Sequence, residues 1–427
     1  MYRLIYTFLH ILILPLYFLR LFLKGIKNKE YLYRWDERIA LGRLKPSGKK
    51  KVIWIHAVSV GEVNASIPLI RKIIEKYSKV EVLVTTTTPT GSKILLDKMG
   101  SRVSHQYLPI DIPLFIYLFL RKWKPEGLIL LETEIWPNLI AACKKRKIFV
   151  SLVNARLSEM SLQRYLRFES LISESISDLD LIIAQYHPDK KRLRKLVPRK
   201  KILLCGNLKF DQDIPNEFLE ISKSIREDWS LGKDLRPTLI AASTHEGEEE
   251  QILESFTKIK EEFNNPLLIL VPRHPERFKR VRQLIRSYNL NMSMRSNKEE
   301  VEELTDILLG DTMGELNFLY SLSDVAFVGG TLIDHGGQNL LEPAALSLPI
   351  ITGPSLRNFE EIAKKLKKEG ALEIVRSSKE IENIFTNLIR NKIEINKRKN
   401  ASRLVYEENR GAVDRVLEYL DEFLNKI

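Results

Sequence analysis

The sequence predicts an α/β protein with two domains of similar size, each built on a parallel β-sheet that is covered by helices on both faces. Three observations indicate this fold class. The chain has 427 residues, too many for one small core. Short β-rich runs alternate with stretches that carry apolar residues at helical spacing, and this rhythm starts near residue 51 and restarts near residue 238. Several runs are apolar throughout, which is typical of parallel strands buried on both faces.

Composition narrows the class of protein further. Hydrophobic residues make up 44% and charged residues 29%, which is ordinary for a globular protein and excludes wholesale disorder. The net charge of +13 favours an anionic partner, either nucleic acid, a phosphate-bearing substrate or an acidic membrane surface. The 2 cysteines, Cys143 and Cys205, form no CxxC pair. They predict neither a disulfide framework nor a cysteine zinc site, and they fit a reducing, cytosolic exposure.

The first segment of the chain differs from the rest. Residues 4–19 are almost wholly apolar, and no small-residue cleavage site follows them, so a cleaved signal peptide is not expected. We expect residues 1–30 to be a retained membrane anchor, which either spans the bilayer once or lies in the interface. The alternative is a buried amphipathic helix of the first domain. The basic residues that follow would hold the body on the cytoplasmic side: Lys24, Lys27, Lys29 and Arg34.

Residues 31–212 form the first expected domain, a Rossmann-like domain. Its strands are expected at 51–58, 80–88, 127–134, 147–156, 179–185 and 201–210, with helices at 62–77 and 89–100.

Residues 213–427 form the second expected domain, also Rossmann-like. A polar connector covers roughly 211–237. Strands are then expected at 238–243, 266–274, 306–311, 325–330 and 348–353, and residues 402–427 are helical by period.

Polar and glycine-rich residues gather where the expected strands end. In open α/β sheets ligands bind beyond the carboxyl ends of the strands. Two such domains that face each other across a cleft form the arrangement of a nucleotide-sugar transferase with the GT-B fold. Many other two-domain α/β proteins share the pattern, so it predicts a fold rather than a function.

Three acidic residues and a lysine stand at strand ends of the first half. Glu62 either favours the positive end of a helix dipole or acts as a catalytic carboxylate. Glu132 and Glu134 would point to one face if the strand continued, where they would bind a sugar or a cation or steady a base; the alternative is a salt-bridged turn. Lys209 either meets a phosphate or carboxylate or is an ordinary linker cation.

The second half offers a candidate anion and nucleotide site. Arg273 follows a strand directly and suits a phosphate or carboxylate. Residues 311–315 suggest a helix start whose N–H groups hold a phosphate, although Thr312 and Glu315 also match a capping box. Asn339 and Glu342 have the same capping spacing, but a carboxylate such as Glu342 also suits the hydroxyls of a ribose.

Glycine pairs and histidines complete the sequence evidence in this half. Gly329-Gly330 and Gly336-Gly337 favour close approach of the backbone to a ligand. The histidines are scattered without metal-ligand spacing, so we expect no metal: His56, His245, His274 and His335.

Eight stretches in a fixed order resemble one family. They are HAVSVGEVNAS, ETEIWPNL, NARLS, GNLKFD, ASTHEGEEE, LVPRHPERF, GDTMGEL and FVGGTL…GGQNLLEPA. Together they resemble the 3-deoxy-D-manno-octulosonic acid (Kdo) transferases, which attach Kdo to lipid A precursors in Gram-negative bacteria. The resemblance extends from the N-terminal anchor to about Phe359.

The resemblance implies a GT-B fold, CMP-Kdo as donor and a tetraacyl lipid A precursor (lipid IVA) as acceptor, with no metal or other cofactor. It also implies the cytoplasmic face of the inner membrane. Glu62 corresponds to the general base, while Glu132 and Lys209 correspond to residues that assist the transition state. The CMP contacts correspond to the following residues: Pro272, Arg273, Met313, Gly314, Glu315, Asn339, Leu340, Leu341 and Glu342.

The expected chemistry is a single displacement with inversion. Glu62 would take the proton of an acceptor hydroxyl, and its place at a helix start is expected to keep it ionised. The chain departs from the family pattern at Gln338 and Ser355, where the family has His, and near Ser347, where it has Gly. Gln338 keeps hydrogen bonding but cannot become positive.

Two other functions remain open from the sequence. One is a GT-B transferase or epimerase that uses another nucleotide sugar. The other is a non-catalytic protein that binds anionic lipid through basic clusters such as Lys190–Lys201. A nucleic-acid partner is not expected, because the basic runs lack interleaved aromatic residues. No motif sets the number of Kdo units added.

Overall fold

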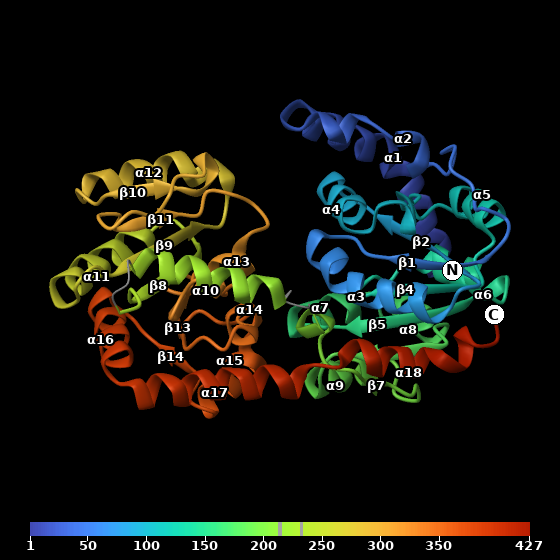
Figure 1. The fold of residues 1–427 in the computed structure, drawn as a ribbon. Coiled ribbons are helices and arrows are strands. Elements are labelled where there is room, and N and C mark those ends of the chain that lie inside the picture. The colour runs from blue at the N-terminus through green and yellow to red at the C-terminus, as the bar shows by residue number, and fades with distance from the viewer. Residues whose placement is uncertain (212–215, 231–233) are drawn as a thin grey trace. The chain divides into compact units, whose positions relative to one another are not determined.

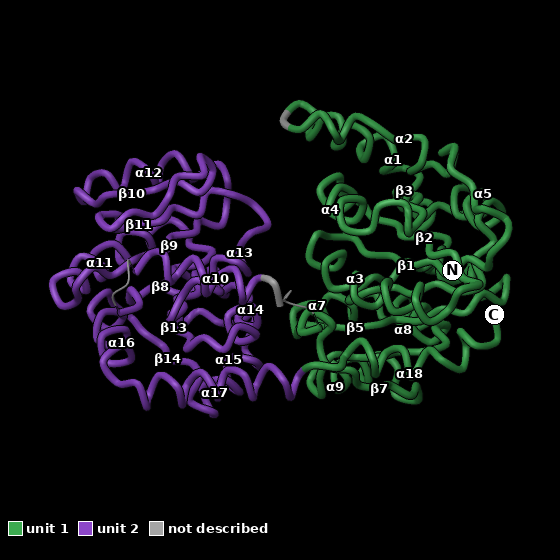
Figure 2. The backbone as a smooth tube through the Cα atoms, viewed as in Figure 1, with its two compact units in different colours: residues 1–212, 410–427 green, residues 213–409 purple. Residues whose placement is uncertain are grey.

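The computed structural model describes residues 1–211, 216–230 and 234–427 of the chain. These residues form two compact units (Figure 2). The first unit is Met1–Gln212 with Arg410–Ile427, and the second is Asp213–Asn409. In the described residues each unit contains a 7-stranded sheet whose strand pairs are parallel. The prediction of two doubly wound α/β halves is therefore confirmed.

The sheet of the first unit has the strand order β3-β2-β1-β4-β5-β6-β7. Figure 1 labels β2, β1, β4, β5 and β7 of this sheet. Its strands are β1 (Lys51–His56), β2 (Val80–Thr86), β3 (Ser104–Tyr107), β4 (Gly127–Leu131), β5 (Phe149–Ala155), β6 (Leu181–Ala184) and β7 (Leu203–Leu204). Its helices are α1 (Tyr2–Lys27), α2 (Trp35–Arg38), α3 (Val60–Lys76), α4 (Pro89–Met99), α5 (Pro113–Trp123), α6 (Pro137–Lys145), α7 (Glu159–Leu166), α8 (Glu169–Ser177) and α9 (His187–Leu196). Short 3-10 turns are η1 (Lys29–Leu32), η2 (Gly100–Arg102) and η3 (Leu208–Asp211).

Strand β1 shows why this sheet has two cores. Successive side chains of a strand point to opposite faces. Trp54 accordingly packs in one apolar cluster with residues of α5, α6 and α9, while Ile53 and Ile55 pack in the other with residues of α3 and α4. All three side chains are fully buried, so β1 is packed on both faces up to its carboxyl end.

The sheet of the second unit has the order β10-β11-β9-β8-β12-β13-β14. Its strands are β8 (Thr238–Thr244), β9 (Leu267–Pro272), β10 (Met292–Met294), β11 (Ile307–Leu309), β12 (Val325–Val328), β13 (Ile350–Thr352) and β14 (Leu372–Ile374). Its helices are α10 (Asn216–Ser230), α11 (Glu249–Glu262), α12 (Phe278–Ser287), α13 (Leu316–Ser321), α14 (Leu341–Ala345), α15 (Glu360–Lys368), α16 (Ser378–Arg390) and α17 (Lys392–Asn409), with the turns η4 (Pro275–Arg277) and η5 (Arg295–Asn297).

The C-terminal segment differs from the expected domain division at 213–427. Helix α17 belongs to the second unit, whereas α18 (Ala412–Leu424) belongs to the first. Gly411, with φ 80°, separates the two helices, and its N–H donates to Asp211 at 2.7 Å. Apolar periodicity alone identified a helix here, but it does not indicate which sheet the helix covers.

Leu420 tests the contribution of α18 to the first unit. Its side chain is fully buried in the cluster that also holds Ile53 and Val416. Leu420→Ala is expected to lower the free energy of unfolding by roughly 2–5 kcal/mol, because it removes buried methyl groups and leaves a cavity. Urea unfolding measures the change, and Leu404→Ala, at a half-exposed site in α17, is the control.

Candidate active site

Glu62 lies in the first turn of α3, directly beyond the carboxyl end of β1. Its Oε2 accepts a hydrogen bond from Val58 N at 2.8 Å, and its Oε1 accepts one from Ser59 Oγ at 2.8 Å. Ser59 is the N-cap and accepts from Glu62 N at 3.3 Å. Glu62 and Ser59 therefore form a reciprocal cap, and the carboxylate is fixed at the helix start.

Burial works against the charge of Glu62. The side chain is only 7% exposed, and desolvation raises the pKa of Glu62, with a further rise from the charge of Glu132. The Val58 N–H, the Ser59 hydroxyl and the Lys209 ammonium act in the opposite direction. The expectation that the helix start keeps this acid ionised thus omitted the larger effect of burial. A carboxylate with a raised pKa is a stronger base than an ordinary one.

Lys209 and Glu132 form an ion pair next to this helix start. Lys209 Nζ lies 2.9 Å from Glu132 Oε1, and both side chains are largely buried. A Cβ placed on Gly61 would lie 3.8 Å from Lys209 Nζ, so the ammonium lies beside the first turn of α3. Glu132 has φ 55°, an uncommon conformation for glutamate that occurs where the surroundings impose it.

Asn154 fixes the position of Lys209. Its Oδ1 accepts from Leu208 N at 3.1 Å, which ties η3 to the end of β5. Asn154 has φ 57° and is 1% exposed. The residue lies in the NARLS stretch, and it was not among the predicted site residues because its role depends on a contact across more than fifty positions of the chain.

Glu134 adds a third carboxyl group with a different protonation. Desolvation and the nearby charge of Glu62 raise the pKa of Glu134 to about 8. Trp136 Nε1 donates to its Oε2 at 2.9 Å, and the Nε2 of His56 lies 3.9 Å from the same oxygen. His56 is fully buried, and burial lowers its pKa to about 4, so the ring is neutral at pH 7.

Glu134→Gln tests the protonation of this carboxyl group. The folded state keeps the proton up to about pH 8, whereas an unfolded glutamate loses it near the ordinary value of 4.5. The folded state therefore binds more protons in this window, and the free energy of unfolding falls as the pH rises through it. In the variant, the free energy of unfolding measured with urea should fall less steeply as the pH rises. A slope that matches that of the parent chain would contradict the assignment, and Glu126→Gln, at an exposed ion pair, is the control.

The three carboxyl groups together offer both an acceptor and a donor of protons. Glu62 and Glu132 accept hydrogen bonds or pair with cations, while Glu134 carries a proton at neutral pH. A neighbouring carboxylate disfavours the charged form of a carboxyl group, and the charge of Glu62 raises the pKa of Glu134 in this way. The predicted residues Glu62, Glu132 and Lys209 are thus brought together in the first unit.

Arg273 lies directly beyond the carboxyl end of β9 in the second unit. Its N–H donates to Thr244 O at 3.0 Å, which joins the ends of β9 and β8. Its side chain is exposed, and its charge lowers the pKa of Glu342 against the larger effect of burial. Arg273 and Glu342 therefore lie near enough to each other for their charges to interact.

Helix α14 begins beside this arginine. Asn339 Oδ1 accepts from Leu341 N at 3.2 Å, but the N-cap of α14 is Leu340, so the capping box that the spacing of Asn339 and Glu342 suggested is absent. Asn339 also hydrogen-bonds the carboxylate of Glu342. Leu340 and Leu341 are at most 2% exposed, so their side chains belong to the core and only their backbone can reach a ligand. Pro272 is likewise buried.

Met313 and Gly314 lie in a loop and not in a helix start. Helix α13 begins at Leu316, and Gly314 has φ 89°. Thr312 donates to the carboxylate of Glu315, which also pairs with Arg295 at 2.9 Å, so the predicted capping box is absent and its two side chains bond each other instead. Met313 is 63% exposed and available for contact.

Two imidazole rings and Gln338 lie around the ring of His245. The ring of His245 lies 4.2 Å from that of His335 and 5.5 Å from that of His274, and Gln338 Nε2 is 3.1 Å from His245 Nε2. Burial and the surrounding cationic side chains lower the pKa of His245 to about 4. No group of three or more His, Cys, Asp or Glu side chains among the described residues has metal-binding geometry.

Glu248 organises the glycine-rich loop and was not predicted. Its carboxylate is fully buried and accepts four backbone N–H groups at 2.7 to 3.0 Å. The donors are His245, Gly330, Thr331 and Leu332. The carboxylate fills the place that a bound anion takes in a phosphate-binding loop, so these N–H groups are not free for a donor phosphate.

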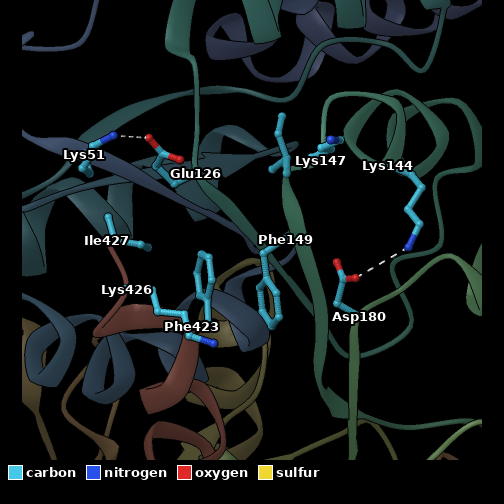
Figure 3. Close-up of a pocket in the computed structure, with 10 residues that line it drawn as sticks. Lys51, Glu126, Lys144, Lys147, Phe149, Asp180, Phe423, Lys426 and Ile427 are labelled. Carbon is cyan, nitrogen blue, oxygen red and sulfur yellow. Dashed lines mark hydrogen bonds and ion pairs between the residues drawn. The ribbon is translucent and has the colours of Figure 1, made fainter.

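A cavity of about 480 Å³ lies at the amino ends of the strands of the first sheet (Figure 3), whereas Glu62 lies beyond a carboxyl end. Its lining includes the first residues of β1 and β5, Lys51 and Phe149. Lys51 pairs with Glu126 at 2.6 Å and Lys144 lies 3.7 Å from Asp180. Because it lies at the amino ends of the strands and these two cations are paired, the cavity is separate from the candidate site.

Known proteins share the fold of two α/β units. A solved structure described as a glycosyltransferase from Rickettsia africae aligns with 88% of this chain and 99% of its own at 14% identity, with a TM-score of 0.58. A putative UDP-N-acetylglucosamine 2-epimerase from Listeria monocytogenes aligns with 88% and 98% at 16% identity, with a TM-score of 0.59. The family model described as "Glycosyl transferases group 1" matches residues 239–407. The fold and the second unit thus define a glycosyltransferase of the GT-B type.

The family follows from closer relatives. The model described as "3-Deoxy-D-manno-octulosonic-acid transferase (kdotransferase)" matches residues 33–212. The 3-deoxy-D-manno-octulosonic acid transferase of Haemophilus influenzae is 39% identical over 100% of both chains, and that of Rickettsia felis is 31% identical over 99% of this chain and 100% of its own. The chain belongs to the 3-deoxy-D-manno-octulosonic acid transferase family, which confirms the resemblance.

Proposed function

We propose that this Kdo transferase family member moves Kdo from CMP-Kdo to a hydroxyl of the lipid A precursor, with inversion and in the course of lipopolysaccharide synthesis. The observation that carries the proposal is the buried Glu62 carboxylate at the start of α3, in one cluster with Glu132 and Lys209. A two-substrate transfer to an alcohol needs a base for the acceptor and positive charge for the leaving phosphate. The chain offers both.

Glu62 acts as the general base. The acceptor oxygen attacks the anomeric carbon of Kdo while Glu62 takes the hydroxyl proton. The bond from that carbon to the phosphate oxygen breaks, and CMP leaves with the bonding electrons. Attack and departure on opposite faces give inversion. The raised pKa of Glu62 supports this role, because a base is most effective when its pKa approaches the working pH.

Arg273 and Lys209 supply positive charge to the anionic groups of the donor, which are its phosphate and the carboxylate of Kdo. Glu342 binds the ribose hydroxyls of CMP. These side chains provide the charge that the leaving group needs, and the proposed reaction uses no metal or other cofactor.

Glu248→Gln tests the loop that borders the donor site. Gln offers one acceptor oxygen and turns an NH₂ group toward backbone N–H donors, so the loop at Gly330 should shift. We expect the KM for CMP-Kdo to rise by roughly 5–150-fold, corresponding to about 1–3 kcal/mol for an unmatched buried group, with a smaller change in kcat. Steady-state kinetics at varied donor concentration measures it.

The control for this variant is Asp324→Asn. Asp324 Oδ2 also accepts a backbone N–H, from Thr238 at 3.0 Å, and pairs with Arg226 at 2.7 Å, but it lies at the amino end of β12. Both variants should unfold at lower temperature, and only Glu248→Gln should change the donor KM. Equal KM values in the two variants would remove Glu248 from the donor site.

The protein is proposed to act at the cytoplasmic face of the inner membrane, held there by α1. Helix α1 is long and apolar enough to cross a membrane by length and composition, with a mean hydropathy of 1.8 over its most apolar window. Fractionation of cells that express the full chain or residues 24–427 tests the attachment. Release of the shortened chain into the soluble fraction is expected.

The decisive test of function is a transfer assay with the purified full chain, CMP-Kdo and lipid IVA, with mass spectrometry of the lipid. A product heavier by one or more Kdo units supports the proposal, and the mass also gives the number of units. Parallel reactions with UDP-GlcNAc test a transferase or epimerase of another nucleotide sugar. Turnover with that donor and none with CMP-Kdo would overturn the proposal.

A further inference from the structure

Helix α1 has two different faces along its whole length. One face rests on the first unit, and its residues recur three or four positions apart, as expected of one side of a helix: Tyr6, Thr7, His10, Leu14, Tyr17, Phe18, Leu21 and Gly25. The opposite face is exposed and apolar: Leu4, Ile5, Phe8, Leu9, Ile11, Leu12, Leu16, Leu19, Phe22, Leu23 and Ile26.

Polar contacts attach the first half of α1 to the body. Tyr6 Oη donates to Asp111 Oδ2 at 3.0 Å, and Thr7 Oγ1 donates to Asn138 Oδ1 at 3.0 Å. Asp111 is 1% exposed and also accepts from the N–H groups of Asn138 and Leu139 at the start of α6. The start of α1 is thus hydrogen-bonded to groups that belong to the folded core.

Further contacts attach the second half. Arg38 donates from Nη1 to Tyr17 Oη at 2.9 Å and from Nη2 to Thr87 O at 2.9 Å, and it is 2% exposed. Near the end of the helix, a Cβ on Gly25 would lie 2.2 Å from the side chain of Leu32, so η1 packs directly on the glycine.

The attached length is close to the thickness of a bilayer core. From Tyr6 to Gly25 the helix runs roughly 28 Å at about 1.5 Å per residue, against about 30 Å of hydrocarbon. If α1 crossed the membrane, its contacts would break and Asp111 and Arg38 would lose partners, or the body would enter the hydrocarbon. Both alternatives are costly for buried polar and charged groups.

The charge of α1 matches an anionic lipid surface. Residues 1–29 contain no acidic residue, and exposed cations stand at Arg3, Arg20, Lys24 and Lys29. The exposed apolar face continues into a groove of about 490 Å³ between α1 and the corner of α7 and α8, where Phe168 is 68% exposed. The apolar surface is therefore shared by the helix and the body.

We propose that α1 lies in the plane of the membrane interface, with its exposed face among the acyl chains of an anionic bilayer and its other face fixed to the first unit. The described residues of α1 and of the first unit then lie on one side of the membrane. This inference rests on the proposed attachment of α1 to the membrane, but it adds the orientation, which attachment alone leaves open.

Cysteine labelling distinguishes the two orientations. Cys143 and Cys205 are fully buried, so a membrane-impermeant maleimide reports an introduced cysteine. Tyr2→Cys and the exposed control Lys50→Cys are labelled in intact spheroplasts and in inverted vesicles. An in-plane helix predicts that both cysteines react only in inverted vesicles. Reaction of Tyr2→Cys in intact spheroplasts, with Lys50→Cys unreactive there, would overturn the proposal.

Depth measurement gives a second test in reconstituted vesicles that contain anionic lipid. Ile5, Leu12 and Leu23 lie on one stripe of the exposed face, and each can carry a spin label through a cysteine. An in-plane helix predicts equal depths for the three labels, whereas a spanning helix places Leu12 deepest. Full-length protein that is soluble in the fractionation test would reject the proposed attachment itself, so the two failures are distinguishable.

Discussion

Replacement of Glu62 by glutamine should lower kcat for Kdo transfer by roughly 10²–10⁴-fold, the usual contribution of a general base. Glutamine keeps the size of the side chain and one acceptor oxygen for the Val58 N–H or the Ser59 hydroxyl, but it takes no proton. The affinity for CMP should be unchanged, because the proposed nucleotide contacts lie in the second unit. The rate of product formation, followed by mass spectrometry, gives kcat. Calorimetric titration with CMP gives the affinity.

Ser59→Ala is the matched control for this variant. It removes the N-cap and one hydrogen bond to Glu62, and should lower stability by about 1 kcal/mol, but it leaves the carboxylate in place. Loss of activity in Glu62→Gln with little loss in Ser59→Ala separates catalysis from helix capping. If Glu62→Gln transfers Kdo at the parent rate, the carboxylate is only a cap.

Lys209→Met should lower kcat by roughly 10²–10³-fold, the effect of removing one group that stabilises transition-state charge. It also leaves Glu132 without its partner at 2.9 Å. Because Lys209 lowers the pKa of Glu62 in the parent chain, that pKa should rise further in the variant, and the ascending limb of the pH–rate profile should move to higher pH.

Two further variants make this test specific. Lys209→Arg restores the charge and should recover part of the rate and the original pH limb. Lys144→Met removes a lysine that lies 3.7 Å from Asp180 at the amino ends of the strands, and it should leave both unchanged. A Lys209→Met profile with an unmoved pH limb would contradict the electrostatic coupling of Lys209 to Glu62.

The fold and most of its strands could be predicted from the sequence, because apolar runs and their spacing report directly on buried parallel sheets. Strands β3, β10 and β14 were not predicted, since these short strands at the sheet edges carry no long apolar run. The strand ends that carry Glu62, Glu132 and Arg273 could be predicted from the apolar runs that precede them. The assignment of α18 to the first unit could not, since its apolar face would suit either sheet.

Residues whose roles depend on contacts with distant parts of the chain also could not be predicted from the sequence. Glu248 accepts N–H groups from a loop more than eighty positions away, and Asn154 accepts one from Leu208. The protonation of Glu134 depends on burial and on the charge of Glu62, which no local pattern reports. The two faces of α1 became distinguishable only through the partners of Tyr6 and Arg38.

The most direct measurement of the central claim is the mass of lipid IVA after incubation with CMP-Kdo and the purified full chain, run beside the Glu62→Gln variant. The account predicts a lipid heavier by Kdo with the parent chain, unchanged lipid with the variant, and equal CMP affinity for both. A parent chain that binds CMP but leaves the lipid mass unchanged, or a variant that forms the heavier lipid as fast as the parent, would contradict it.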